Sequence, residues 1–276
     1  MPLPTLPRQQ RRKMRRDFAE RGRKAIVRGL PETMTDGDAF AIAIALHETF
    51  TDKATPARAS RLADAAETLL DKTMNRDTKG LAYACAKGCG WCCWQRVICT
   101  APEIFRVAEW VRANAARPGV PTLGSIAAAE ASTTGFVATA QPGNQRPCAL
   151  LLDNACTVHP ARPISCRAVL SMSAQACQQA MVEPTTAGPV PLVTSGLDTA
   201  ETVRLLMLSA VAAQGLDDAG YDLTEALAKI LPDPTAETRW LAGDAVFAGV
   251  RTAPRLPAAR FAQNRLVEMI QSLQDA

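Results

Sequence analysis

Apolar residues recur at helical spacing along most of this chain, whereas the alternating patterns typical of strands are few. Helices are predicted over about residues 37–50 (GDAFAIAIALHETF) and 56–72, where apolar positions share one face. Another helix should begin after Thr100, because Glu103 follows three residues later, as in a capping box, and Pro102 lies in the first turn.

The rest of the chain continues this pattern. Helical spacing predicts a short helix over about 124–139 and four helices in the last third of the chain, at about 198–214, 222–231, 235–249 and 256–274. Asp198 and Asp222 are suited to cap two of these helices. The segment QPGNQRP (141–147) is predicted to be a loop, because it holds two prolines and a glycine.

Composition agrees with a mainly α fold. The 276 residues are 47% hydrophobic, which is enough to bury a substantial core in one large domain or two small ones. Aromatic residues make up only 5%, whereas alanine and leucine, which favour helices, are abundant. The expected organisation is a basic N-terminal arm (1–30), a helical region that holds the cysteines (31–183, with its core at 79–170), a Pro- and Gly-rich linker (184–197) and a C-terminal helical region (198–276).

Positive charge is concentrated at the N-terminus. Residues 1–30 carry ten Lys or Arg and two Asp or Glu, although the whole chain has a net charge of only +4. Such an arm suits an acidic partner, nucleic acid or an anionic membrane, or it is simply a solvated tail. Phe18 is its one aromatic residue, which gives no support for base stacking.

The sequence also bears on location. It has no run of eighteen apolar residues, so no membrane span is expected. The paired arginines near the start are not followed by an apolar segment, which argues against a secretory or twin-arginine leader. We therefore expect a cytoplasmic protein, in which thiols stay reduced.

Nine cysteines give the chain its distinctive chemistry. Five lie in the fifteen residues CAKGCGWCCWQRVIC, from Cys85 to Cys99, and none occurs in 100–147. The second group comprises Cys148, Cys156, Cys166 and Cys177. Two patches this dense need an explanation beyond chance.

Three ordinary explanations account for the cysteines less well than a metal site. Buried cysteines that act as small hydrophobes account for one or two positions, and this is the favoured interpretation of Cys177, which lies on a helical pattern. Disulfides are disfavoured by the odd count and by the absence of a secretion signal. A redox pair of Cys89 and Cys92 lacks the βαβ pattern that usually surrounds one.

Metal or cluster binding explains the pattern best. Thiolates are soft ligands for zinc and for iron–sulfur clusters. Gly88 and Gly90 flank Cys89 and permit a turn that aims nearby sulfurs at one centre. Trp91 and Trp94 either shield that centre from water or pack in the core. The candidate ligands are Cys85, Cys89, Cys92, Cys93, Cys148, Cys156 and Cys166.

The number of thiols raises a further question. Seven exceed the four ligands of one tetrahedral site, so either some are not ligands or the site is polynuclear. Cys92 and Cys93 are adjacent, and neighbouring side chains usually diverge, so one of them can serve a second centre or the core.

These motifs resemble a known family. The chain resembles the YkgJ-type CxxCxxCC cysteine-cluster family of zinc- or iron-chelating proteins in three segments. These are Cys85-AKG-Cys89-GW-Cys92-Cys93, CALL from Cys148 and CTVHPARPISCR from Cys156. The family's second half reads C-P-F-L and then C-x-I-Y-x-x-R-P-x-x-C-R. Thr100 and Glu103 match its T-x-x-E, and the likeness covers about residues 79–170.

The chain also departs from the family pattern. Three residues separate Cys85 from Cys89 where the family name has two, Ala149 and Leu150 replace Pro and Phe, and His159 replaces Tyr. A more distant likeness is to flagellin lysine N-methylase, which has a similar cysteine array and an associated iron–sulfur cluster. That likeness implies a shared cofactor more than shared chemistry.

Other side chains near the array have two interpretations each. His159 is either a zinc ligand or a packing residue, the latter being favoured because the family has an aromatic there. Arg162 and Arg167 either neutralise thiolates or form surface salt bridges. Glu103 is a ligand, a base or only a helix cap, and His47, on an apolar helix face, is expected to be structural.

The sequence therefore predicts a helical protein with a central cysteine-rich metal-binding loop region. A [4Fe–4S] cluster is favoured over Zn²⁺, because thiols so outnumber histidines. Three function classes remain open: a metal-binding accessory protein, an enzyme that modifies a protein or peptide, and an interaction protein whose zinc only stabilises the fold. No G-x-G-x-x-G or G-x-x-x-x-G-K-[ST] fingerprint occurs.

Overall fold

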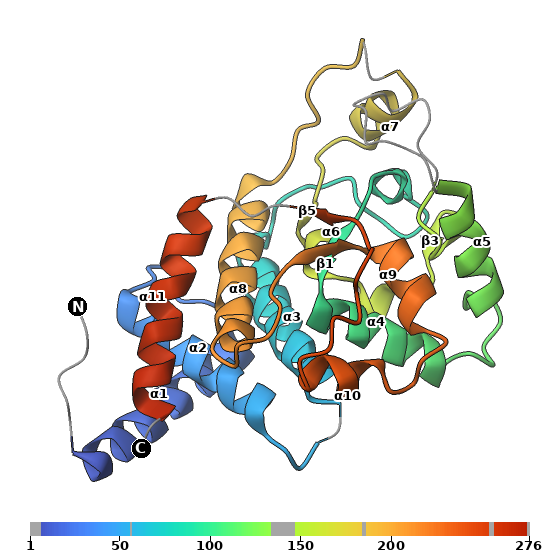
Figure 1. Ribbon diagram of the computed structural model, residues 1–276. Coiled ribbons are helices and arrows are strands. Elements are labelled where there is room, and N and C mark those ends of the chain that lie inside the picture. The colour runs from blue at the N-terminus through green and yellow to red at the C-terminus, as the bar shows by residue number, and fades with distance from the viewer. Residues whose placement is uncertain (1–6, 56, 134–146, 184–185, 254–256, 275–276) are drawn as a thin grey trace.

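The computed structural model describes residues 7–55, 57–133, 147–183, 186–253 and 257–274. In these residues it is mainly helical, which confirms the predicted fold class at that level (Figure 1). The helices are α1 (Arg8–Arg28), α2 (Asp36–Thr51), α3 (Arg58–Asp77), α4 (Ala101–Ala113), α5 (Leu123–Thr133), α6 (Ile164–Ala168), α7 (Ala174–Val182), α8 (Thr194–Ala212), α9 (Leu223–Ile230), α10 (Ala236–Leu241) and α11 (Pro257–Gln274).

Helix α2 is the centre of the helical layer. Every residue from Phe40 to His47 is buried, because α2 is apolar on nearly all sides. It contacts α1, α3, α8 and α11, which surround it (Figure 1). A capping box between Thr35 and Asp38 starts the helix, since each side chain bonds the other's backbone amide.

The basic N-terminal segment forms α1, and this helix packs on α2. Its contact face is Ala19, Gly22 and Ile26, and a Cβ at Gly22 would lie only 2.0 Å from the Ala41 carbonyl oxygen. A larger residue at position 22 would therefore push the two helices apart. Ion pairs at the edge, such as Arg23 with Glu48 at 2.8 Å, add little because they are exposed.

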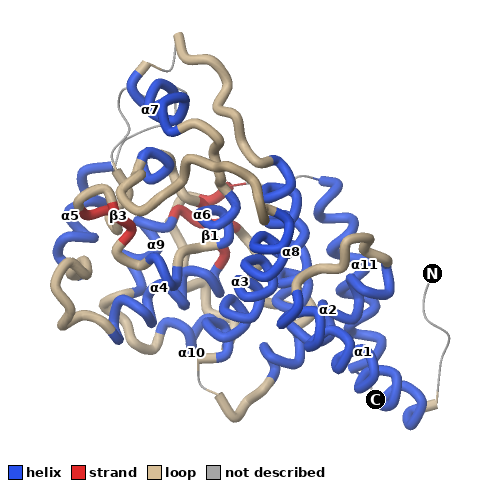
Figure 2. The backbone as a smooth tube through the Cα atoms, turned by 180° about the vertical axis from the view of Figure 1, so that it is seen from behind, coloured by secondary structure: helices blue, strands red, loops and turns tan. Residues whose placement is uncertain are grey.

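A small antiparallel sheet joins the cysteine region to the C-terminal half. Strand β1 (Ile98–Thr100) pairs with β4 (Gly220–Asp222), which pairs in turn with β5 (Thr252–Ala253). Cys99 lies opposite Tyr221 in this register. Strand β1 leads directly into α4 and β4 into α9, so the sheet fixes where both helices begin (Figure 2).

Several predicted boundaries hold and others do not. The helices expected at 37–50, 56–72 and after Thr100 are present as α2, α3 and α4, and Asp222 caps α9 by accepting from the Glu225 amide. Asp198 is not a cap, because α8 begins four residues earlier, at Thr194. The helix expected at 235–249 ends at Leu241, shortly before Gly243, whose φ of 97° is unsuited to a helix.

Other expectations fall partly outside the described residues. Residues 141–146 of the expected loop and the end of the helix expected at 124–139 fall within residues 134–146, which are not described. Of the expected linker at 184–197, the part from Thr194 onward is the first turn of α8. Within the described residues, no helix combines the length and the apolar character needed to cross a bilayer.

His47 makes stability depend on pH. It is buried in α2, contacts the side-chain amides of Gln214 and Gln274, and burial lowers its pKa to about 4. The unfolded chain takes up this proton near pH 6.5 whereas the folded chain does not, so stability is lost as pH falls from 6.5 towards 4. Acidification from pH 7 to 5 should cost about 2 kcal/mol through this group.

Urea denaturation of the wild type and of His47→Gln at both pH values checks this. The difference in unfolding free energy between pH 7 and pH 5 should shrink in the variant. An equal loss in both proteins would contradict the assignment.

Candidate metal centre

The two cysteine groups are joined directly through the backbone. The Cys148 amide donates a 2.7 Å hydrogen bond to the Cys93 carbonyl, so two positions far apart in the chain become neighbours. At the other end, the Ala84 amide donates to the Ser171 carbonyl at 2.8 Å. The Ser171 amide in turn donates to the Cys85 sulfur at 3.2 Å. These bonds bring residues 84–93 against 148–171.

A tight hairpin sets the position of Cys156. Strands β2 (Leu151–Leu152) and β3 (Ala155–Cys156) pair so that Cys156 lies opposite Leu151. Asp153 and Asn154 form the two-residue turn with φ of 49° and 56°, a conformation that Asp and Asn tolerate well. A Cβ at Gly90 would lie 3.2 Å from a Leu151 methyl group, so this glycine lets the first cysteine segment approach the hairpin closely.

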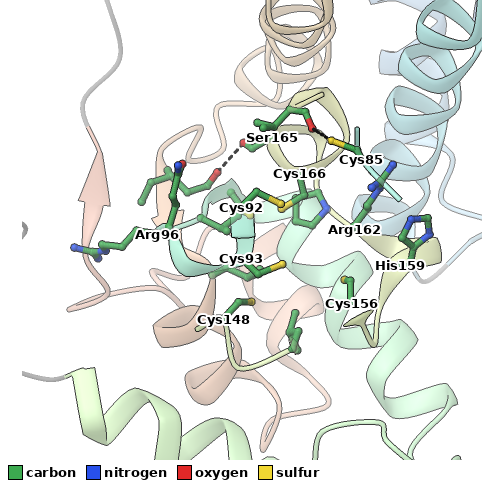
Figure 3. Close-up of a pocket in the computed structure, with 18 of the residues that line it drawn as sticks. Cys85, Cys92, Cys93, Arg96, Cys148, Cys156, His159, Arg162, Ser165 and Cys166 are labelled. Atoms are coloured by element: carbon green, nitrogen blue, oxygen red, sulfur yellow. Dashed lines mark hydrogen bonds between the residues drawn. The ribbon is translucent and has the colours of Figure 1, made fainter. Parts of the chain in front are cut away.

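All nine cysteines line one cavity of about 930 Å³. The seven predicted ligands are therefore brought to one place, together with Cys99 from β1 and Cys177 from α7. We call this space the cysteine cavity. Figure 3 shows Cys92, Cys93, Cys148, Cys156 and Cys166 around it, with Arg162 on the side of Cys85 and His159.

The thiols lie around one cavity, but they form no disulfide and no finished metal site among the described residues. Every cysteine is a free thiol. Among the described residues, no three Cys, His, Asp or Glu side chains are grouped so that they could hold a metal ion. The cysteine cavity thus concentrates sulfur donors without a finished coordination site.

Burial and mutual repulsion keep most of these thiols protonated. Burial raises the pKa of Cys148 to about 11, and the neighbouring Cys156 adds to this effect. The pKa of Cys166 is raised by burial and then by Cys148 and Cys156. Several thiolates forced together in a low-dielectric space repel each other, and a bound cation reverses that repulsion.

Cys92 differs from the other shifted thiols because its pKa is lowered. It is the exposed cysteine of the nine, and the Cys93 thiol donates a hydrogen bond to its sulfur, which lowers the pKa of Cys92 to about 6 and raises that of Cys93. Both access and thiolate character favour alkylation. In the metal-free chain at pH 7, limiting iodoacetamide should therefore modify Cys92 first.

Tandem mass spectrometry of the peptide that contains Cys89, Cys92 and Cys93 reads out the order. The Cys93→Ala variant, which removes the donor, should slow the modification of Cys92. Modification of Cys93 before Cys92 would contradict the assigned direction of the hydrogen bond.

Glu103 holds the two halves of the motif together. Its fully buried carboxylate accepts from the Thr100 amide at 2.8 Å and from the Thr100 hydroxyl at 2.6 Å, which confirms the predicted capping box. The other oxygen accepts from the Ile164 amide at 2.8 Å. Glu103 is thus a clamp between the start of α4 and α6, and α6 carries Cys166. It does not line the cysteine cavity.

Arg167 anchors the cysteine region to α3. Its guanidinium donates to Asp71 at 2.5 Å and to Glu67 at 2.8 Å, and also to the carbonyls of Pro160 and Arg162. The side chain is 7% exposed, so this is a buried network and not a surface salt bridge. Arg167 does not line the cysteine cavity, but its charge, like that of Arg162, acts to lower the pKa of Cys156, which burial raises.

Arg162, unlike Arg167, is part of the cavity wall. It lines the cysteine cavity, and its charge acts on Cys92 and Cys156. His159 also lines the cavity, but it is exposed. Arg162 is thus the arginine of the R-P-x-x-C-R segment that faces the sulfurs.

Sequence reasoning missed two parts of the site. Cys177 was assigned to the core, but α7 has no buried residue and Cys177 is half-buried at the cavity wall. The lack of an apolar stripe around it in SAQACQQAM was an available signal. Ser171, whose amide bonds the Cys85 sulfur, carries no signal because a backbone donor is independent of residue type.

The chain matches no protein-family model, no curated protein and no solved structure.

Proposed function

We propose that this is a metal-binding protein whose cysteine cavity holds an iron–sulfur cluster. The observation that carries the proposal is the convergence of all nine free thiols on one cavity. Scattered hydrophobic cysteines have no reason to face a common space, and disulfides are absent among them. The resemblance to the YkgJ-type cysteine-cluster family points the same way.

The chemistry of the donor set fits such a group. Cys92, Cys93, Cys148, Cys156 and Cys166 line the cavity and offer more than the four thiolates that a cluster needs (Figure 3). Cys85 and Cys89, which also line it, are the further ligand candidates. When bound, the cluster would supply electron transfer or a Lewis-acidic iron.

Binding must change the cavity. Because no three donors among the described residues are placed to hold an ion, the sulfurs have to move inward when metal binds. The raised thiol pKa values mean that binding also releases protons. Metal uptake should therefore be weaker at low pH and should protect residues 79–100 from proteolysis.

The test is anaerobic purification followed by an absorption spectrum and by assays for iron, zinc and acid-labile sulfide. A brown protein with about four iron and four sulfide per chain supports the proposal. A colourless protein with zinc and no sulfide replaces the cluster with a structural zinc site. Absence of every metal from the anaerobic preparation would overturn the proposal.

A further inference from the structure

The wall of the cysteine cavity is strongly cationic. Four basic residues line it, Lys87, Arg96, Arg162 and Arg204, against one acidic residue, Glu201. Two of the arginines have partners: Arg96 donates to Asp222 at 2.8 Å, and Arg204 donates to Ser165 at 2.7 Å and pairs with Glu201.

Arg162 has no such partner. Within the described part of the chain Arg162 pairs with no carboxylate, its Nε is buried without a hydrogen-bond partner, and the Cys92 sulfur is an acidic group on which its charge acts. Arg162 is half-buried, and a guanidinium whose buried Nε lacks an acceptor is suited to pair with an anion that enters the cavity. Arg162 lines the cavity together with the cysteines drawn in Figure 3, and its charge acts on Cys92 and Cys156.

The backbone of Arg162 is fixed by a hydrogen bond, whereas its side chain is free to pair with a ligand. Its carbonyl accepts from Arg167 Nε at 2.7 Å, and Pro163 follows it. The buried Arg167 network therefore fixes where the Arg162 side chain enters the cavity. Replacement of the Arg162 side chain leaves this backbone bond intact.

The remaining wall is suited to an organic ligand. Apolar side chains such as Val97, Leu150 and Leu205 line the cavity. A volume of about 930 Å³ lies within the range of small-molecule pockets, which are mostly apolar with a few convergent polar groups.

The charge and shape favour a carboxylate. One guanidinium fork matches the two oxygens of a carboxylate in a bidentate pair. Phosphate groups are usually held by several backbone amides at a helix N-terminus or in a glycine-rich turn. Arg162 offers a single fork in an apolar setting, so the expected ligand has one carboxylate and an apolar body.

We propose that the cysteine cavity binds a small organic carboxylate whose charge pairs with Arg162. This site goes beyond the metal centre proposed above and does not require it. In the metal-bound protein the carboxylate would lie beside the sulfurs, so the cavity would bring an organic acid to the cluster.

The test is a titration of the full-length protein, as purified and after metal removal, with 3-phenylpropionate and hexanoate. Their amides serve as neutral isosteres, and calorimetry measures the affinities. Each acid should bind at least about tenfold more tightly than its amide. Arg162→Met should abolish this preference, and Arg162→Lys should retain part of it. Arg61→Met, at an exposed arginine bonded to Thr55, should leave it unchanged.

The outcomes separate this proposal from the metal proposal, because iron, zinc and sulfide are measured in the same samples. An acid preference that depends on Arg162 would support the carboxylate site whatever the metal content, whereas absence of iron, zinc and sulfide from the anaerobic preparation would overturn only the metal centre. Equal affinity of acid and amide, an unchanged preference in Arg162→Met, or no binding of either acid at about 10 mM would overturn the carboxylate site. Circular dichroism confirms that each variant is folded.

Discussion

Arg167→Leu should destabilise the protein by about 3–5 kcal/mol, which is the usual range when one partner of a buried ion pair is removed. The loss arises because Glu67, which is 1% exposed, would keep only Arg106 as a cationic partner. The carbonyls of Pro160 and Arg162 would also lose their donor. Urea denaturation followed by circular dichroism measures the change.

Arg239→Leu is the matched control. Arg239 also bridges two carboxylates, Asp233 and Asp244, at 3.0 Å each, but its side chain is 53% exposed. Its removal should therefore cost less than about 1 kcal/mol. Equal losses in the two variants would show that burial does not distinguish these networks.

The effect of Arg167→Leu should also depend on pH. Burial raises the pKa of Glu67 to about 7, even though Arg167 and Arg106 act to lower it. Because the folded pKa is raised, the stability contributed by Glu67 is present below pH 4.5 and is lost as pH rises through 7. Without Arg167 the folded pKa rises further, so the variant should fall further behind the wild type at pH 8 than at pH 5.5.

On the proposal of a metal centre, Cys166→Ala should lower the metal content per chain at least about tenfold, and the metal-linked stabilisation should be lost with it. Cys166 lies on α6 between two anchored residues, the Glu103-bonded Ile164 and Arg167, so the backbone that carries its sulfur is held from both sides. The thermal midpoint of this variant should no longer respond to a chelator.

Cys99→Ala provides the control for this variant. Cys99 is 1% exposed, lines the same cavity and lies in β1, but it is not among the predicted ligands. The variant should keep its metal and its response to the chelator, with only a modest packing loss. Equal loss of metal from both variants would contradict the predicted ligand set.

Local sequence signals predicted the parts of the fold that depend on neighbours in the chain. Apolar spacing located α2 and α3, and the Thr100–Glu103 capping box located the start of α4. The start of α8 was misplaced, because Asp198 is a suitable cap by type but four residues of α8 precede it.

The site itself depends on pairs that no local pattern contains. Glu67 lies 100 residues from Arg167, and nothing around position 67 distinguishes it from a solvated helix residue. The second bond of Glu103, to Ile164, spans 61 residues in the same way. Sequence spacing could group the cysteines into two patches, but the contact between Cys93 and Cys148 is a backbone bond and leaves no trace in residue type.

The pairing of β1 with β4 has a consequence for the order of events in the cell. Arg96 and Asp222, which bond across this junction, are 126 residues apart, and Gly220, Leu223 and Ala253 form part of the cavity wall. During synthesis at about 5–20 residues per second, the cysteine segments leave the ribosome well before that wall exists. The thiols therefore spend several seconds as an open, unassembled array, and the enclosed site forms only after residue 253 has emerged.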